Sequence, residues 1–193
     1  MLFVIGLGNP ERRYQRSRHN IGFVVVDALA DALRINFTAG RGEYLVGQGS
    51  HRGQSIGLVK PLTYMNQSGV AVLEVRERFD VPLEEMLVVC DDFQLPLGRL
   101  RLRASGSDGG HNGLYSIIYQ LQSEEFPRLR CWIASAFTPT DKTQMAEYVL
   151  GMFTKEEQPV AQSMIERARD ACLAVAAEGL TNAMNEVNRK ENT

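Results

Sequence analysis

The chain has 193 residues, of which 44% are hydrophobic, so it can bury a large apolar core within a single domain spanning residues 1–193. Its 21 basic and 23 acidic side chains give a formal net charge of −2, which excludes attraction of phosphate by the molecule as a whole. Any contact with nucleic acid must then come from a local group of cations.

The cysteines and the apolar segments indicate the compartment. Cys90, Cys131 and Cys172 are odd in number and widely spaced in apolar surroundings, which favours reduced thiols over a disulfide framework. Residues 1–5 lack the charged region and cleavage site of a signal peptide, and no apolar run approaches the roughly 18 residues of a membrane span. We therefore expect a soluble cytoplasmic protein without a membrane partner.

The N-terminal part predicts a strand, a helix and a hairpin. Leu2–Ile5 is an apolar run that predicts a buried strand, ended by the tight loop Gly6–Pro10. Apolar residues recur at helical spacing from Ile21 to about Leu33, with Asn20 as the expected N-cap. Two strands around residues 51–54 then predict an antiparallel hairpin over residues 44–59.

The middle of the chain alternates helical and strand patterns. Ser68 is the expected cap of a helix that ends at Phe79, and Met86–Cys90 predicts a central strand. Arg99–Arg103 alternates arginine with leucine, so a strand there places the arginines on one face and the leucines on the other. The glycine-rich loop at residues 105–110 leads to a second helical stretch.

The C-terminal part predicts a strand and a long helix. Leu129–Ala134 has the composition of a strand, and apolar residues repeat every three or four positions from Val160 to Val175, before the stop signal at Gly179. Strands interleaved with helices predict a three-layer α/β domain whose central sheet is mixed, mostly parallel and flanked by helices.

Common cofactor and nucleophile motifs are missing from the sequence. The loop Gly6–Pro10 is similar to a dinucleotide-binding loop, but Glu11 stands at the third glycine position and Pro10 hinders the usual helix start. No phosphate-binding P-loop and no Gly-x-Ser-x-Gly nucleophile motif occurs. The three histidines lack metal-ligand spacing, so we expect no metal. A nucleotide-dependent enzyme remains an alternative that rests on this loop alone.

A histidine and an aspartate remain as candidates for hydrolytic chemistry. His19 lies just before the first predicted helix, and Asp91 lies at the end of a predicted strand, where open α/β sheets form their ligand crevices. A neutral imidazole accepts a proton from water, and a carboxylate on its other nitrogen fixes the tautomer. Each residue alone is equally compatible with a cap or a turn.

Asparagines and arginines leave two interpretations open. Asn9, Asn66 and Asn112 lie in loops, where they either form turns and caps or donate amide N–H groups to a substrate carbonyl. The arginines of residues 99–103 and 128–130 form a phosphate clamp if the two segments are neighbours, or a solvated strand face balanced by acidic groups.

Taken together, these segments resemble the bacterial peptidyl-tRNA hydrolase family over nearly the whole chain. The motifs occur in the family's order and at its spacing. They are Gly6–Pro10, Tyr14, Arg18–Gly22, Pro61–Gly69, Gly109–Leu114 and Phe126–Arg130, with weaker markers at Tyr148–Gly151 and Ala183–Asn185.

The resemblance implies a monomeric hydrolase that cleaves the ester between peptide and tRNA without cofactor or metal. It implies that His19 activates water, that Asp91 orients His19, and that Asn66 and Asn112 position the water and the scissile carbonyl. It assigns substrate binding to Asn9, Tyr14, Tyr64, Met65 and His111, and the tRNA phosphate to Arg101, Arg103 and Arg130.

Several residues depart from the family's usual pattern and keep a second interpretation open. Cys90, Gln94 and Trp132 replace residues that the family usually has, and Asp108 adds a negative charge to the glycine-rich loop, which would weaken contact with phosphate. A large indole at position 132 requires local repacking and would narrow a groove. The alternative is a non-catalytic RNA-binding relative of the same fold, similar to splicing factors that resemble this family.

Overall fold

The computed structural model describes residues 1–190, apart from the side chains of residues 142 and 190, so residues 191–193 of the predicted domain lie outside the described part. The strands are Leu2–Gly6 (β1), Thr38–Ala39 (β2), Tyr44–His51 (β3), Gln54–Pro61 (β4), Met86–Pro96 (β5), Leu100–Arg103 (β6) and Arg128–Ala134 (β7). The α-helices are Ile21–Leu33 (α1), Ser68–Phe79 (α2), Asn112–Leu121 (α3), Lys142–Leu150 (α4), Gln158–Glu178 (α5) and Leu180–Lys190 (α6).

The strands form one mixed sheet in the order β2-β3-β4-β1-β5-β7-β6. Strands β4, β1, β5 and β7 pair in parallel, whereas the pairs at both edges are antiparallel. Parallel strands covered on both faces are typically continuous apolar runs, and Met86–Cys90 in β5 is fully buried. The predicted α/β class with a mixed sheet is confirmed.

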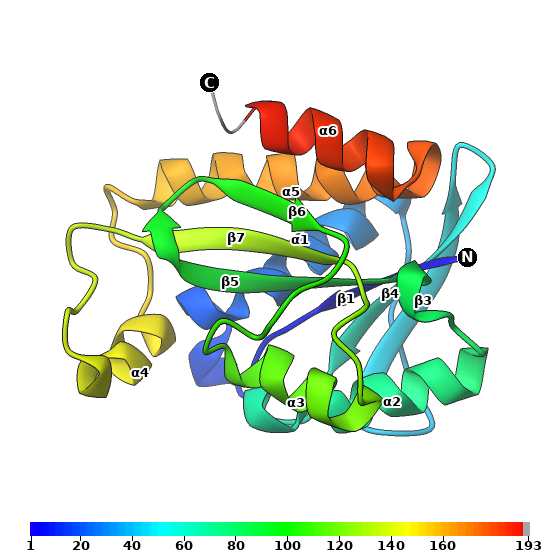
Figure 1. The fold of residues 1–193 in the computed structure, drawn as a ribbon, viewed down its shortest axis with the longest axis horizontal. Coiled ribbons are helices and arrows are strands. Elements are labelled where there is room, and N and C mark those ends of the chain that lie inside the picture. Colours follow the sequence, from blue (N-terminus) through cyan, green and yellow to red (C-terminus); the bar gives the residue numbers. More distant parts are fainter. Residues whose placement is uncertain (191–193) are drawn as a thin grey trace.

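Helices cover both faces of the sheet and complete three layers (Figure 1). On one face, α1, α5 and α6 enclose an apolar cluster that includes Leu29, Met164 and Cys172. On the other face, α2 and α3 enclose a second cluster that includes Val72 and Ile117. Helix α4 lies at one end of the sheet, away from both layers (Figure 1). None of the helices within residues 1–190 has the length and apolar character needed to cross a membrane.

The hairpin and the arginine strand form as predicted. Strands β3 and β4 pair around Arg52 and Gly53, whose φ angles of 48° and 82° fit the two-residue turns that join twisted antiparallel strands. In β6, Leu100 and Leu102 are buried while Arg101 is half-buried and Arg103 is exposed. The alternation therefore divides the strand between core and surface.

Other elements differ from the prediction. Helices α4 and α6 were not predicted, and β5 extends beyond Cys90 to Pro96. Ser68 is the first residue of α2, where its Oγ donates to the carbonyl of Met65 at 2.9 Å instead of capping the helix. Val160, predicted on the apolar face of α5, is 45% exposed, whereas the later predicted positions Met164, Ala168, Cys172 and Val175 are buried.

Two glycines bring the start of α1 against the end of β1. A Cβ on Gly6 would lie 2.3 Å from the carbonyl oxygen of Gly22, and a Cβ on Gly22 would lie 2.4 Å from the nitrogen of Leu7. Because real Cβ atoms do not approach so closely, both positions require glycine. This contact gives the Gly6–Pro10 loop a packing role and fixes the segment before α1, which contains His19.

A buried ion pair anchors the same segment from the other side. Arg18 donates to Glu157 at 2.6 Å, and their side chains are only 6% and 9% exposed. The Arg18 guanidinium also donates to the carbonyl of Met152 and lies over the rings of Tyr148 and Phe153. The chain between α4 and α5 is thereby joined to the residue that precedes His19.

Glu157→Gln should lower the free energy of unfolding by about 3 kcal/mol at neutral pH, because Arg18 would keep a buried charge without its counter-ion. Burial opposes ionisation of Glu157, but hydrogen bonds from Thr154 and Arg18 more than offset it and hold its pKa below the ordinary value. The stabilisation is therefore lost as the pH falls below about 4.5 and through this lowered pKa. Denaturant unfolding at several pH values measures the difference, with exposed Glu156→Gln as control; equal stability of the two variants would contradict it.

Candidate functional site

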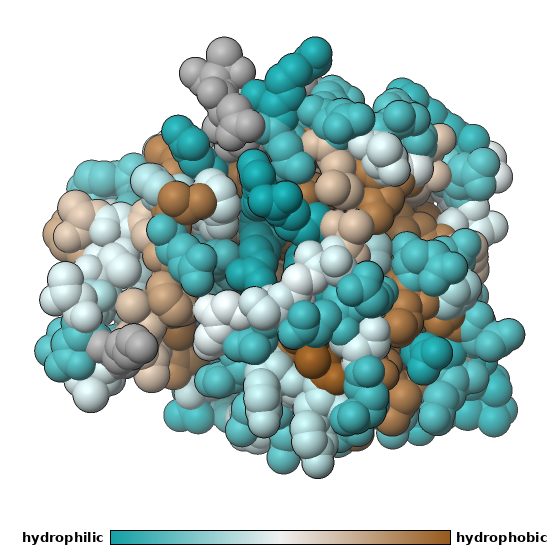
Figure 2. Space-filling view, in the orientation of Figure 1, coloured by the Kyte–Doolittle hydropathy of each residue, from teal (hydrophilic) through white to brown (hydrophobic). Residues whose placement is uncertain are grey.

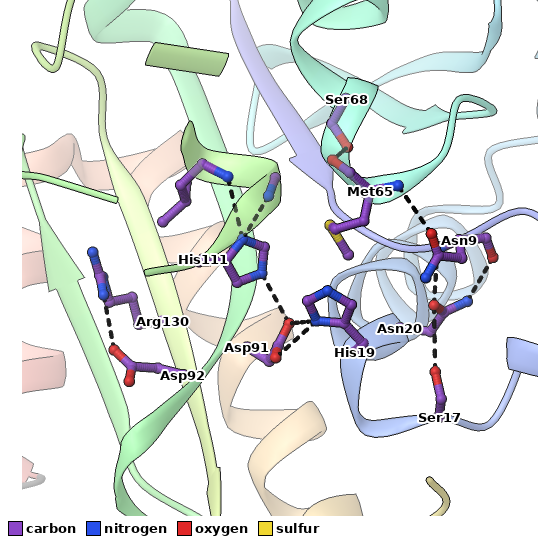
Figure 3. Close-up of polar contacts among 12 residues, drawn as sticks. Asn9, Ser17, His19, Asn20, Met65, Ser68, Asp91, Asp92, His111 and Arg130 are labelled. Carbon is purple, nitrogen blue, oxygen red and sulfur yellow. Dashed lines mark hydrogen bonds and ion pairs between the residues drawn. The ribbon is translucent and has the colours of Figure 1, made fainter. Parts of the chain in front are cut away.

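His19 and Asp91 are joined by a hydrogen bond across the end of the sheet (Figure 3). His19 lies in the short helical turn Arg18–Asn20 before α1, and Asp91 lies in β5. The Nδ1 atom of His19 is 2.8 Å from Oδ1 and 3.0 Å from Oδ2 of Asp91. An ionised carboxylate only accepts, so Nδ1 carries the proton and Nε2 of the neutral ring is left with its lone pair. The structure thus joins the two residues that the sequence singled out.

The pair is electrostatically coupled. Asp91 is 2% exposed, and burial favours its neutral form, but the neighbouring His19 and His111 more than offset this and hold its pKa below the ordinary value. Burial lowers the pKa of His19, but the negative charge of Asp91 and its hydrogen bond raise it by more, so that the pKa is higher than the ordinary value. An imidazolium on His19 is therefore stabilised by a carboxylate that stays ionised.

His111 is a second imidazole on the same carboxylate. Its Nε2 lies 3.0 Å from Oδ1 of Asp91, and its Nδ1 accepts from the N–H groups of Gly113 and Leu114 at 3.1 and 3.2 Å, which caps α3. The ring centroids of His19 and His111 are 5.0 Å apart. Both ring nitrogens of His111 are thus occupied within the protein, which disfavours the expected direct polar contact of this ring with substrate.

The same group of side chains has the spacing of a metal site but not its protonation pattern. Donor atoms of His19, Asp91 and His111 lie within 4.8 Å of one another. Because Nδ1 of His111 accepts two backbone N–H groups, the ring proton is on Nε2, and a protonated nitrogen has no lone pair for a metal. The geometry favours a hydrogen-bonded His-Asp-His group.

These side chains lie in a hollow of about 490 Å³. Glycines 109 and 110 line it from the loop before α3, Asn112 lines it from the first position of α3, and Phe93 and Gln94 line it from β5. Met145, Ala146 and Val149 of α4 form a further wall. Sequence reasoning missed this wall because it predicted no helix at residues 142–150.

Asn20 has a role that the sequence did not indicate. Its side chain does not cap α1. Instead, its Oδ1 accepts from the nitrogen of Asn9 at 2.8 Å and its Nδ2 donates to the carbonyl of Asn9 at 2.9 Å. The Oδ1 of Asn9 then accepts from the nitrogen of Met65 at 2.9 Å, and Figure 3 shows this chain of contacts beside His19. Asn20 therefore holds Asn9, and Asn9 in turn connects the loop after β1 to the segment after β4.

The three asparagines do not all meet at His19. Asn112 lines the hollow of His19, and Asn9 is buried with its side-chain Oδ1 accepting from the nitrogen of Met65. Asn66 is exposed and lines a separate hollow of about 440 Å³, together with Tyr115 and Tyr119. Of these amides, Asn112 alone is among the residues that line the hollow of His19 in the described part of the chain.

The two tyrosines proposed for the substrate lie on loops outside this hollow. Tyr64 is 52% exposed and donates from its hydroxyl to Glu11 at 2.6 Å, which raises the pKa of Tyr64 and lowers that of Glu11. The ring of Tyr14 lies under the guanidinium of Arg13, 4.6 Å from ring centroid to guanidinium carbon. The hydrogen bond between Tyr64 and Glu11 connects the loop after β1 with the loop after β4.

The two arginine segments are neighbours, as the clamp hypothesis requires. Strands β6 and β7 pair antiparallel, with Arg101 opposite Arg130 and Arg103 opposite Arg128. These arginines and Arg99 line a hollow of about 540 Å³. Strongly hydrophilic side chains gather in a hollow over β6 and β7 (Figure 2). It shares Gln94 and Gly109 with the hollow of His19, so the two adjoin.

The arginines of this hollow differ in their freedom. Arg128 is 1% exposed and donates to backbone carbonyls of Gly106, Glu124 and Phe126, so it holds the loop before β7. Arg130 donates to Asp92 at 2.9 Å and to the carbonyl of Ser107 at 2.7 Å, which fixes its guanidinium at the wall.

The residues that depart from the family pattern have structural explanations. Burial raises the pKa of the Cys90 thiol to about 12, so it is a neutral core residue. The Trp132 ring is buried in the wall of the arginine hollow. Asp108 accepts from the nitrogen of Gly110 at 2.7 Å and so shapes the turn before α3. Weaker phosphate contact through Asp108 stays a prediction.

Comparisons with known proteins give one consistent result. The family model described as peptidyl-tRNA hydrolase matches residues 3–193. A peptidyl-tRNA hydrolase of Chlorobaculum parvum is 47% identical over 98% of both chains, and one of Chloroflexus aggregans is 47% identical over 97% of this chain and 99% of its own. A crystal structure of peptidyl-tRNA hydrolase from Acinetobacter baumannii is similar with a TM-score of 0.91 at 32% identity, covering 97% of this chain and 94% of that one. From its motifs, its fold and these relatives, the chain belongs to the peptidyl-tRNA hydrolase family.

Proposed function

We propose that this protein hydrolyses the ester between the peptide and the tRNA of peptidyl-tRNA and releases free tRNA. The observation that carries the proposal is the imidazole of His19, held through Nδ1 by Asp91 at 2.8 Å within an open hollow. Among the side chains that the structure describes, none hydrogen-bonds to its Nε2, so this nitrogen is available to a water molecule. Family membership supports the substrate.

In the proposed reaction, Nε2 of His19 takes a proton from water while the water oxygen attacks the ester carbonyl carbon. Asp91 stabilises the imidazolium and keeps the ring in the required tautomer. The tetrahedral intermediate collapses by breaking the bond to the ribose oxygen, which takes the proton from the imidazolium. The products are the tRNA hydroxyl and the peptide carboxylic acid, which then releases its proton to solvent, and the sequence of steps uses no metal or cofactor.

The asparagines contribute amide donors in this proposal. The side chain of Asn112 lines the hollow and is suited to stabilise the oxyanion or orient the water. Asn66 would have to turn from its separate hollow to share that role. Asn9, fixed by Asn20, would bind near the ester, with Tyr14, Tyr64, Met65 and the outer face of His111 contacting the peptide or the acceptor end.

The arginine hollow is suited to a tRNA phosphate. We assign this role to Arg101, Arg103 and Arg130, which line a hollow that adjoins the one of His19. A small footprint at the acceptor end requires few cations, so a chain of net charge −2 can bind it. The proposal also comprises a monomer acting in the cytoplasm, where peptidyl-tRNA is made, and sedimentation would test the monomer.

Arg101→Ala and Arg130→Ala should each weaken tRNA binding and reduce the slope of log binding constant against log salt by roughly one. Hydrolysis of a minimal ester without the tRNA stem should change little, because these arginines do not contact Asp91 or His19. Binding titrations over a range of salt concentrations measure the effect, with Arg52→Ala in the β3–β4 turn as control. Equal losses on full tRNA and on the minimal ester would remove the phosphate role.

The direct test is to incubate the protein with an N-acetylated aminoacyl-tRNA and follow the release of free tRNA. We expect turnover of the blocked ester and little turnover of the same aminoacyl-tRNA with a free amino group. Tight binding of tRNA without cleavage would contradict the proposal. That outcome would favour a non-catalytic RNA-binding protein, the alternative that the substitution of Trp132 beside the arginines raises.

A further inference from the structure

The carboxylate of Asp91 is shared unequally by two imidazoles. Its Oδ1 lies 2.8 Å from Nδ1 of His19 and 3.0 Å from Nε2 of His111, whereas its Oδ2 lies 3.0 Å from His19. The two histidines come from different parts of the chain, one before α1 and one before α3. Asp91 thus connects both loops to β5 (Figure 3).

The proton of His111 is fixed by the start of α3. Two backbone N–H groups, those of Gly113 and Leu114, point at its Nδ1. A nitrogen that accepts these bonds carries no proton, so the ring proton is on Nε2, which donates to Asp91. The helix cap therefore sets the tautomer of a side chain that is 7% exposed.

A carboxylate that accepts an additional hydrogen bond is a weaker base, because the donor stabilises its negative charge. We propose that His111 is a positioning residue that orients Asp91 and limits how strongly this carboxylate holds a proton on His19. The proposal rests on the proposed function, in which His19 must be neutral to accept a proton from water. It gives His111 a role in catalysis without direct contact with the reacting atoms.

Other charged groups near the pair either have partners of their own or are exposed. Asp92 of β5 is paired with Arg130 of β7, and Glu157 before α5 is paired with Arg18. Glu147 of α4 is exposed, and Asp108 in the loop before α3 binds the nitrogen of Gly110. Within the described residues, the side chains that hydrogen-bond to Asp91 are those of His19 and His111. A substitution of His111 that removes the donor therefore removes the one described side-chain hydrogen bond to this carboxylate that does not come from His19.

Three substitutions separate the cap from the contact with Asp91. In His111→Asn the amide oxygen can still cap α3, but the side chain is too short to donate to Asp91. In His111→Gln the amide nitrogen can reach Asp91, but the cap is lost. His111→Leu removes both functions. The free energy of unfolding should therefore depend on whether α3 is capped, with His111→Asn closest to the wild type. The pKa of His19 should instead depend on whether residue 111 donates a hydrogen bond to Asp91.

The experiment measures the pH midpoint of kcat/KM and, separately, the titration of the His19 ring by NMR, with His51 on the β3–β4 hairpin as internal reference. Loss of the donor should make Asp91 hold the His19 proton more strongly. We expect both midpoints to rise by roughly 0.5 to 1 pH unit in His111→Leu and His111→Asn and to stay near the wild type in His111→Gln.

Midpoints that stay within the error of the wild type in His111→Leu and His111→Asn would overturn the inference. So would midpoints that shift in the variants that lose stability rather than in those that lose the hydrogen bond to Asp91. The outcome is separable from that of the proposed function. If the wild-type protein cleaves no peptidyl-tRNA, the proposed function fails, but the NMR titration still tests the effect of His111 on His19.

Discussion

Replacing His19 by alanine should lower kcat on an N-acetylated aminoacyl-tRNA by roughly 10²- to 10⁴-fold, the range for loss of a general base. The reason is the position of the ring, with Nδ1 bound to Asp91 and Nε2 free of hydrogen bonds to the side chains that the structure describes. Without this nitrogen, water must attack without transferring its proton to a base. KM should change less than kcat, because the arginine hollow is separate from the lost ring.

The control for His19→Ala is His51→Ala, which removes a histidine of the β3–β4 hairpin. Circular dichroism and thermal unfolding establish that both variants are folded, and steady-state kinetics measures the rate. Turnover in folded His19→Ala within a few-fold of the wild type would exclude the imidazole as the base.

Asp91→Asn should reduce kcat by roughly 10²-fold or more. An asparagine offers one oxygen acceptor, whereas Nδ1 of His19 and Nε2 of His111 both donate to Asp91 in the wild type. Its amide N–H would favour the opposite tautomer of His19, with the lone pair turned away from the hollow. Loss of the negative charge also removes the influence that raises the pKa of His19, so the pH midpoint of the remaining activity should fall.

Asp92→Asn is the matched control, since this neighbouring carboxylate binds Arg130 rather than a histidine. It should leave the pH midpoint in place, whatever its effect on tRNA binding. A pH profile of kcat/KM for both variants separates the two carboxylates. If Asp91→Asn retained both the wild-type rate and the wild-type midpoint, Asp91 would have no part in the mechanism.

The core elements were predictable because their patterns are local. Leucine and arginine alternate in β6, and the burial of Leu100 and Leu102 follows that alternation. The spacing of apolar residues likewise placed α1 at residues 21–33. Helix α4 gave no such signal. Among the α4 side chains whose burial is described, only Tyr148 and Val149 are buried, so no apolar repeat marks this helix. Gly179 ends α5 as predicted, but no pattern in the sequence indicated that α6 begins at the next residue.

The candidate site was predictable only as far as its positions depend on general rules of α/β folds. A residue that follows a predicted central strand and one at the start of a helix are expected near one edge of the sheet. His19 and Asp91 do meet, although β5 continues past Asp91, which lies just beyond the last pair of β5 with β1. The cap formed by His111 and the contacts of Asn20 depend on tertiary packing between loops far apart in sequence. Spacing also could not show that Asn66 lies in a separate hollow.

The most direct test of the central claim compares the pH dependence of kcat/KM with the titration of His19 followed by NMR in the wild-type protein. Because its pKa is raised above 6.5, the rate should be low where the ring is protonated and should rise to a plateau as it becomes neutral, with coincident midpoints. A rate that stays constant while His19 titrates would contradict its role as the base that activates water.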